Sequence, residues 1–213
     1  MELKGKRIAF LGDSITEGVG ATNFHGYVDC FSELTGAYCE NFGISGTRIA
    51  KQKKPTVDSP LFDYDFCMRA DKIKGNFDVI VVFGGTNDFG HGDADFGVFS
   101  DSTPDTFYGA LHTLYQTLMQ KHPDSKIVVI TPIYRADEEE ISAVKKRKLR
   151  SYVGAVKEVA EYYNLPVLNL FENQKPPYKS IINDSLLADG VHPNDEGHKF
   201  IAEKIKVFLE NNL

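Results

Sequence analysis

Residues 79–88 read Val-Ile-Val-Val-Phe-Gly-Gly-Thr-Asn-Asp, and this stretch decides the fold class. Five consecutive apolar residues without polar alternation are typical of a strand that is buried on both faces, as in a parallel sheet. The two glycines that follow mark a turn directly after the strand. Similar short apolar runs lie at 7–11, 38–42, 127–130 and 166–170. We therefore predict five parallel strands.

Apolar residues at helical spacing lie between these strands. One such pattern starts at Tyr27, and a second runs through Phe107 and Leu118. A third covers 137–163 with Asp137 as its N-cap, and the last starts near Asn194. Strands that alternate with helices predict right-handed β-α-β units. We expect a three-layer α/β/α fold of the doubly wound, flavodoxin-like type, with residues 1–213 forming a single domain.

Ser14, Gly46 and Asn87 each lie a few residues after one of the first three strands. The carboxyl ends of parallel strands meet at one edge of the sheet, and ligands of doubly wound folds bind there. A serine needs a neighbouring base to act as a nucleophile, and a histidine oriented by a carboxylate is the usual base. Asp189 and His192 are three residues apart, so one turn of chain can place both on one side. The sequence therefore offers a Ser-His-Asp arrangement if the fold brings these distant segments together.

Four sequence blocks occur in order along the chain. They are Gly12-Asp13-Ser14, Gly43-Ile44-Ser45-Gly46, Gly85-Thr86-Asn87-Asp88 and Asp189-Gly190-Val191-His192. With these blocks, the chain resembles the SGNH hydrolases, the GDSL-type esterases and lipases. The resemblance implies that Ser14 is the nucleophile, His192 the base and Asp189 the residue that orients the base. It also implies an oxyanion hole formed by the N–H groups of Ser14 and Gly46 and by the Asn87 side chain.

Composition limits the class of protein further. The 213 residues carry a formal net charge of -6, with 42% hydrophobic and 25% charged residues, as in ordinary globular domains. The negative charge argues against nucleic acid or an anionic membrane as the main partner. The start of the sequence shows no secretory signal pattern, and no apolar stretch approaches the ~20 residues that span a bilayer. We expect a cytoplasmic protein with reduced thiols at Cys30, Cys39 and Cys67.

Other interpretations compete for the same segments. Gly18-Val19-Gly20 resembles part of a dinucleotide loop, but the third glycine is missing. Asp189 and His192 could join His198 in a metal site, but zinc needs three or four ligands, and His198 is expected to lie off the apolar face of its helix. We therefore expect neither a metal nor a cofactor. A flavodoxin-like protein that binds phosphate or flavin is the non-enzyme alternative, which a yellow colour of the pure protein would indicate.

The segments 47–75 and 89–103 are irregular and are expected to shape the substrate pocket. Both are largely polar or charged, which suits a hydrated leaving group better than a long fatty tail. Phe89, Phe96 and Phe99 are the exception, because they could line a modest apolar pocket. We expect a serine esterase that removes a short acyl group, such as acetyl, from a small substrate such as a sugar. An acyl-CoA thioesterase and a lysophospholipase-type lipase are the alternatives, and a homo-oligomer stays open.

Two groups of polar residues near the carboxyl ends of the predicted strands are candidates for a binding role. Lys51, Lys53 and Lys54 follow Gly46 closely and could meet an anionic substrate, although a solvated loop is the simpler interpretation. Among the remaining histidines, His25 and His91 lie nearest to the expected site. They are candidates for substrate contact.

Overall fold

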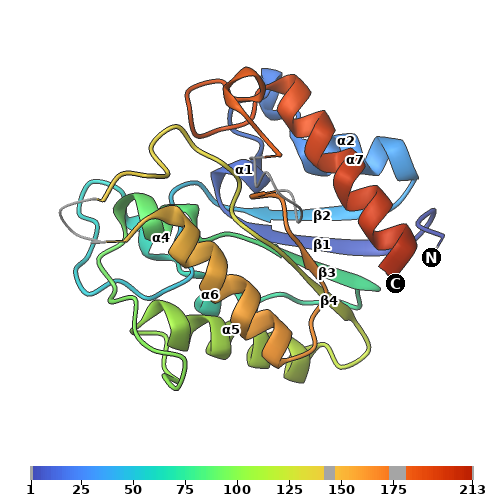
Figure 1. Ribbon diagram of the computed structural model, residues 1–213. Helices are drawn as coiled ribbons and strands as arrows, with labels where there is room; N and C mark the ends of the chain where they lie inside the picture. Colours follow the sequence, from blue (N-terminus) through green and yellow to red (C-terminus); the bar gives the residue numbers. More distant parts are fainter. Residues whose placement is uncertain (1, 142–146, 173–180, 213) are drawn as a thin grey trace.

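One sheet of five parallel strands forms the centre of the described chain, as the sequence predicts. The computed structural model describes residues 2–141, 147–172 and 181–212. The strands follow the order β2-β1-β3-β4-β5 (Figure 1). Their bounds are Arg7–Gly12 for β1, Tyr38–Gly43 for β2, Val79–Phe83 for β3, Lys126–Ile130 for β4 and Val167–Leu168 for β5.

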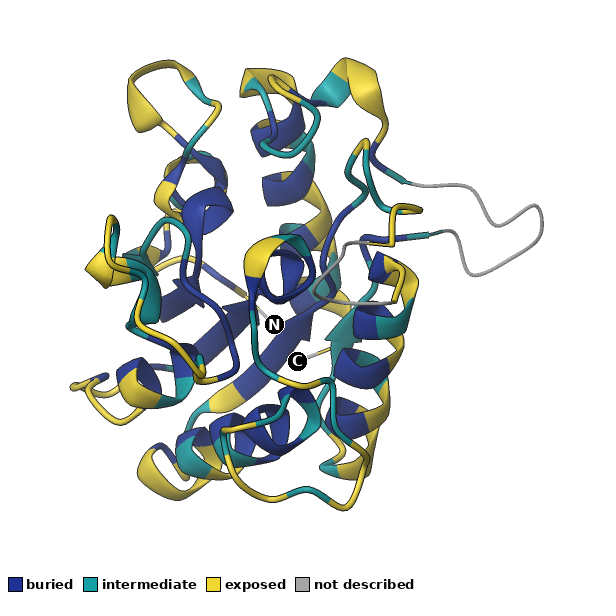
Figure 2. Ribbon diagram, turned by 90° about the vertical axis from the view of Figure 1, so that its left-hand side faces the viewer, coloured by how far each residue is buried: buried dark blue, intermediate teal, exposed yellow. Residues whose placement is uncertain are grey.

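The central strands are buried on both faces. Ile80 and Val82 of β3 pack into one hydrophobic core, whereas Val79 and Val81 pack into a second core across the sheet. Alternate residues of a strand face opposite sides, so a strand between two cores has no polar position. The interior strands are accordingly dark blue in Figure 2. β2, at the edge of the sheet, is only partly buried.

Helices cover both faces and complete the predicted three layers. α2 (Tyr27–Thr35) and α7 (Asp195–Asn212) pack side by side on one face (Figure 1). The other face carries α3 (Phe66–Ala70), α4 (Thr86–His91), α5 (Phe107–Lys121) and α6 (Leu149–Tyr162). The short α1 (Ser14–Glu17) follows β1, and 3-10 turns lie at Thr22–Phe24, Pro60–Asp63 and Asp184–Leu186. No helix in the described ranges is long and apolar enough to cross a membrane.

The helix predicted over 137–163 begins later than expected, at Leu149. Residues 136–139 form a turn, and 142–146 lie outside the described residues. The prediction of Asp137 as an N-cap is wrong, because Arg135 contacts both oxygens of its carboxylate. A bidentate pair with a guanidinium holds a carboxylate firmly, and Asp137 is therefore bound to its neighbour in the chain rather than to a helix end.

The fifth strand is shorter than the predicted 166–170. Val167 and Leu168 pair with β4, opposite Val129 and Ile130. Beyond them, the Leu170 N–H donates to the Thr131 hydroxyl at 3.0 Å. A side chain thus takes the place of the next backbone acceptor, and the ladder ends there.

The first three strands end at the same level of the sheet. Gly12 at the end of β1 lies opposite Gly43 of β2 and Phe83 of β3. The connections that follow these strands therefore begin at one edge. In doubly wound folds the crevice between such diverging connections is where ligands bind.

Candidate active site

Ser14, His192 and Asp189 lie within hydrogen-bond distance of one another. His192 Nε2 is 3.0 Å from Ser14 Oγ, and His192 Nδ1 is 2.7 Å from Asp189 Oδ2. Ser14 begins α1 and His192 lies just before α7, so the fold brings distant segments of the chain together. A histidine placed between a serine hydroxyl and a carboxylate can take the serine proton.

A tight turn fixes Asp189 relative to His192. Asp189 Oδ1 accepts the N–H groups of Val191 at 3.0 Å and His192 at 2.8 Å. Gly190 has a φ of 84°, a left-handed conformation that glycine adopts readily. Partial burial acts to raise the pKa of Asp189, but hydrogen bonds from His192 and Val191 outweigh it and hold the pKa below its ordinary value. The carboxylate is therefore charged at neutral pH and can stabilise an imidazolium.

Ser14 follows the buried end of β1 by two residues and is only 5% exposed. Asp13 is the N-cap of α1, and its Oδ1 accepts the Ile15 N–H at 3.1 Å. Burial raises the pKa of Asp13 to about 6, although the Ile15 hydrogen bond and the charges of Arg69 and His192 oppose the shift. The nucleophile candidate is thus preceded by a carboxyl group that titrates near neutral pH.

Gly46 and Asn87 line the same cavity as Ser14 and His192, which has a volume of about 310 Å³. Gly46 has a φ of 74°, and a Cβ there would lie 2.2 Å from Cε1 of Phe62. The Asn87 Nδ2 donates to the Thr47 carbonyl at 3.0 Å. Backbone and amide N–H groups are the donors that a developing oxyanion needs. The remaining lining residues are Val19, Ser45, Phe62, His91, Arg135 and Val191.

A buried arginine ties together the loops around this cavity. Arg69, which is 6% exposed, donates to the ends of β1 and β2 and to the loop after β2. The acceptors are the Gly12 carbonyl at 2.9 Å, the Phe42 carbonyl at 2.7 Å and the Thr47 hydroxyl at 2.9 Å. Burial lowers the pKa of Arg69 to about 10, while Asp13 and Asp65 act to raise it. Arg69 therefore keeps its charge at neutral pH.

A family model described as the GDSL-like lipase/acylhydrolase family matches residues 10–200. The chain belongs to this family. Its members are carboxylic ester hydrolases, which agrees with the resemblance found in the sequence.

The individual relatives share less than a third of their residues with this chain. The GDSL lipase Rv0518 of Mycobacterium tuberculosis is 26% identical over 136 residues, which cover 63% of this chain and 51% of the relative. The chain thus spans about half the length of that protein. A crystal structure from Lactobacillus plantarum is 29% identical with a TM-score of 0.81, covering 99% of both chains. A possible lipase from Chitinophaga pinensis, 22% identical over 98% of this chain and 99% of its own, shares the fold with a TM-score of 0.69.

The three phenylalanines that could have formed an apolar pocket lie elsewhere in this chain. Phe89 is buried in the core and packs edge-on against Tyr152. Phe96 packs against the same tyrosine, and Phe99 packs against His112. None of the three is among the described residues that line the cavity.

The expectation that His198 lies off the apolar face of its helix is wrong. His198 is fully buried in α7. Its Nδ1 accepts the Tyr27 N–H at 3.1 Å, so its Nε2 carries the proton and donates to the Val19 carbonyl at 3.1 Å. Burial lowers the pKa of His198, in keeping with a neutral ring. His198 therefore joins α7 to the chain beside Ser14.

Other residues considered for binding lie outside the described lining of the cavity. Lys51 pairs with Asp105 and Lys53 with Asp95, while the exposed His25 pairs with Glu33. Within the described ranges, no group of three or more His, Cys, Asp or Glu side chains could hold a metal ion. The three cysteines are free thiols and are partly buried.

Sequence reasoning missed several residues of the site. Arg69 and Arg135 stand in segments without a recognised motif, and only the tertiary structure brings them to the cavity edge. His91 is different, because the sequence already makes it a candidate for substrate contact and it lines the cavity. Its position four residues after Asn87 also places both side chains on one face of a helix.

Proposed function

We propose that this chain is a serine ester hydrolase that removes a short acyl group, acetyl above all, from a small hydrated alcohol such as a sugar. One observation carries the proposal. His192 lies 3.0 Å from the Ser14 hydroxyl and 2.7 Å from the Asp189 carboxylate, beside a cavity open to a small substrate. A serine with an oriented base is the requirement for acyl transfer.

The reaction takes place in two halves. Ser14 Oγ attacks the ester carbonyl carbon while His192 Nε2 takes the hydroxyl proton, and Asp189 stabilises the imidazolium. The tetrahedral intermediate collapses, the ester C–O bond breaks, and His192 returns the proton to the leaving alcohol. Water then attacks the acyl-enzyme with His192 again as the base, which releases the acid and restores Ser14.

Three donors serve the negative oxygen of the intermediate. These are the N–H groups of Ser14 and Gly46 and the Asn87 amide. The Ser14 N–H belongs to the first turn of α1, where no preceding helical carbonyl can accept it. Gly46 lines the cavity from the loop after β2, and Asn87 lines it from the first turn of α4. Donors fixed by separate segments need little reorganisation as the charge develops.

The size and lining of the cavity support a short acyl group. A volume of about 310 Å³ is near the lower end for ligand pockets. Six of its ten lining residues are polar or charged, although most of the surface that they expose to the cavity is apolar, and Phe62 packs against Gly46 from one side. A cavity of this size has room for an acetyl group and a small alcohol but little room for a long hydrocarbon tail, and its polar side chains can hydrogen-bond a hydroxylated leaving group.

Two experiments test the proposal. A fluorophosphonate should label Ser14, and Ser14→Ala should abolish ester hydrolysis while the fold stays intact. Ser45 lines the same cavity but donates its hydroxyl to Glu17, so it is the internal control. Labelling at Ser45 alone, or turnover by Ser14→Ala near that of the wild type, would refute the assignment of the nucleophile.

The second experiment tests the acyl and leaving groups. The ratio kcat/KM is measured for p-nitrophenyl esters from acetate to palmitate and for matched thioesters. We expect the highest value at two to about four carbons, with oxygen esters preferred. In an apolar pocket each methylene gains up to ~0.8 kcal/mol, so a steep rise toward eight carbons or more would instead indicate a lipase. A preference for acyl-CoA would indicate a thioesterase.

A further inference from the structure

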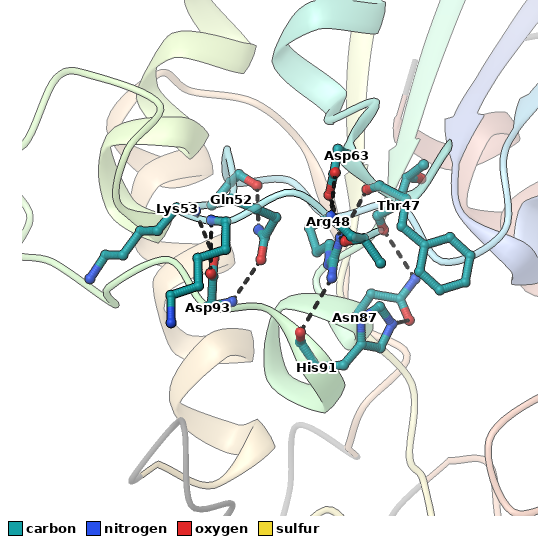
Figure 3. A network of polar contacts seen from close by, with 12 residues as sticks. Thr47, Arg48, Gln52, Lys53, Asp63, Asn87, His91 and Asp93 are labelled. Atoms are coloured by element: carbon teal, nitrogen blue, oxygen red, sulfur yellow. Dashed lines mark hydrogen bonds and ion pairs between the residues drawn. The ribbon is translucent and has the colours of Figure 1, made fainter. Parts of the chain in front are cut away.

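The Asn87 amide is held at both ends by residues from two segments. Its Nδ2 donates to the Thr47 carbonyl at 3.0 Å, and its Oδ1 lies 3.1 Å from His91 Nε2 (Figure 3). A backbone carbonyl can only accept, so the amide nitrogen must face Thr47 and the amide oxygen must face His91. Because that oxygen also only accepts, His91 carries a proton on Nε2 and donates it to Asn87.

We propose that His91 is a positioning residue for the oxyanion hole. Its Nε2–H fixes the Asn87 amide in the orientation that turns Nδ2 toward the developing negative charge. An amide nitrogen has two N–H groups and can therefore donate to Thr47 and to a substrate oxygen together. The inference rests on the proposed function, in which Asn87 is an oxyanion donor.

The alternative orientation of the amide would oppose catalysis. The terminal torsion of asparagine is broad and roughly two-fold, so a half-turn exchanges the nitrogen and the oxygen. The oxygen would then present lone pairs to the oxyanion, and the Thr47 carbonyl would face another acceptor. The Thr47 carbonyl makes that arrangement unfavourable because it can only accept, and His91 opposes it as well while its proton is on Nε2.

His91 is itself fixed by its surroundings. His91 and Asn87 are four residues apart on α4, so their side chains share one face of the helix. The buried Arg48 donates from Nη2 to the His91 carbonyl at 3.3 Å and from Nη1 to Asp63 at 3.2 Å. Figure 3 shows Arg48 between Asp63 and His91. The Phe62 ring lies 5.5 Å from the His91 ring, measured between centroids.

The exposure of His91 sets the size of the expected effect and makes the test practical. His91 is exposed, so water competes for its hydrogen bond. One such bond between neutral groups corresponds to about a 3- to 10-fold change in an equilibrium or rate. Replacing an exposed side chain opens no cavity in the core, and we expect the His91 variants to fold.

The experiment is a kinetic double-mutant cycle with p-nitrophenyl acetate. The cycle combines His91→Leu with Asn87→Ala, and His91→Gln serves as a rescue because its amide N–H can replace Nε2–H. His25→Leu is the matched control, since His25 is also exposed but is not among the described residues lining the cavity. We expect His91→Leu to lower kcat about 3- to 10-fold with KM nearly unchanged. His91→Gln should recover most of this loss, and His25→Leu should have no effect.

The Asn87→Ala background decides between positioning and a general structural role. If His91 acts through Asn87, His91→Leu should change kcat less than about twofold once the amide is absent. An equal loss in both backgrounds, or no rescue by glutamine, would overturn the proposal. If Asn87→Ala itself leaves kcat unchanged, the assigned role of Asn87 fails, which is a different result. Nitrogen NMR of the neutral His91 ring should show Nε2 protonated, and protonation at Nδ1 alone would also overturn the proposal.

Discussion

Asp13→Asn should make the free energy of unfolding less dependent on pH. Asp13 is 1% exposed, and its Oδ2 has no hydrogen-bond partner within the described residues. Burial disfavours the charged form, and the pKa rises from 3.8 to about 6. Asparagine has nearly the same shape and can still accept the Ile15 N–H through Oδ1. The substitution therefore removes the titration and leaves the cap.

The direction of the effect follows from proton binding. Between pH 4 and 6 the folded chain holds a proton on Asp13 that the unfolded chain has lost, so stability falls as the pH rises. The pKa of Asp13 is 3.8 in the unfolded chain and about 6 in the folded chain. This difference lowers the free energy of unfolding by about 1 kcal/mol at pH 4.5 and by about 3 kcal/mol at pH 7.5. The free energy of unfolding of Asp13→Asn minus that of the wild type should thus increase by about 2 kcal/mol from pH 4.5 to pH 7.5.

Urea unfolding of both proteins at several pH values from 4.5 to 7.5 measures this difference. Other groups titrate in the same range, but they are shared by both proteins and largely cancel in the comparison. Burying the new amide can also change the free energy of unfolding by an amount that is the same at every pH. This amount does not affect the result, because the experiment compares only how the free energy of unfolding changes with pH. A difference between the two proteins that stays the same across the range would refute the reasoning and indicate that Asp13 is charged throughout.

The other predictions concern the cavity and its supports. Asn87→Ala should lower kcat by roughly 10²–10³ with little change in KM, as for one lost oxyanion donor, and a rise in KM alone would indicate a binding role. Phe62→Ala should open the cavity beside Gly46, raising kcat/KM for hexanoyl relative to acetyl esters by up to about fourfold per added methylene. His198→Leu should lower the free energy of unfolding by about 2–4 kcal/mol, since the Tyr27 N–H and the Val19 carbonyl would be buried without partners. Urea unfolding tests this last prediction.

The sheet could be predicted because each strand has a recognisable pattern in its own short stretch of sequence. The run at 79–83 lacks polar alternation, and the structure buries it between two cores. The glycines after it end the strand where predicted. The meeting of Ser14, Gly46 and Asn87 at one edge then follows from geometry, since strands that run parallel end on the same side. Family membership agrees with the motifs that these turns contain.

The failures of prediction share a physical cause, which is that side-chain partners, near or distant in the sequence, override local preference. Asp137 has the sequence context of a helix cap, but Arg135 binds its carboxylate and the helix begins at Leu149. His198 lies in a polar stretch of sequence and yet is buried, because Tyr27 and Val19 satisfy both of its ring nitrogens. No local sequence pattern predicts a hydrogen bond between residues more than 170 positions apart, such as Tyr27 and His198.

The edge that carries the candidate site is held by a buried charge as well as by strand pairing. Arg69 donates to Gly12 at the end of β1, to Phe42 near the end of β2 and to Thr47 in the loop after β2. These contacts join the end of β1, just before Ser14, to the loop that contains Gly46, and Thr47 in turn accepts from Asn87. A buried guanidinium is costly unless hydrogen-bonded, so the buried charge of Arg69 needs all three acceptors. The proposed oxyanion donors therefore belong to one network around Arg69. A substitution that moves one of these segments should shift all three donors.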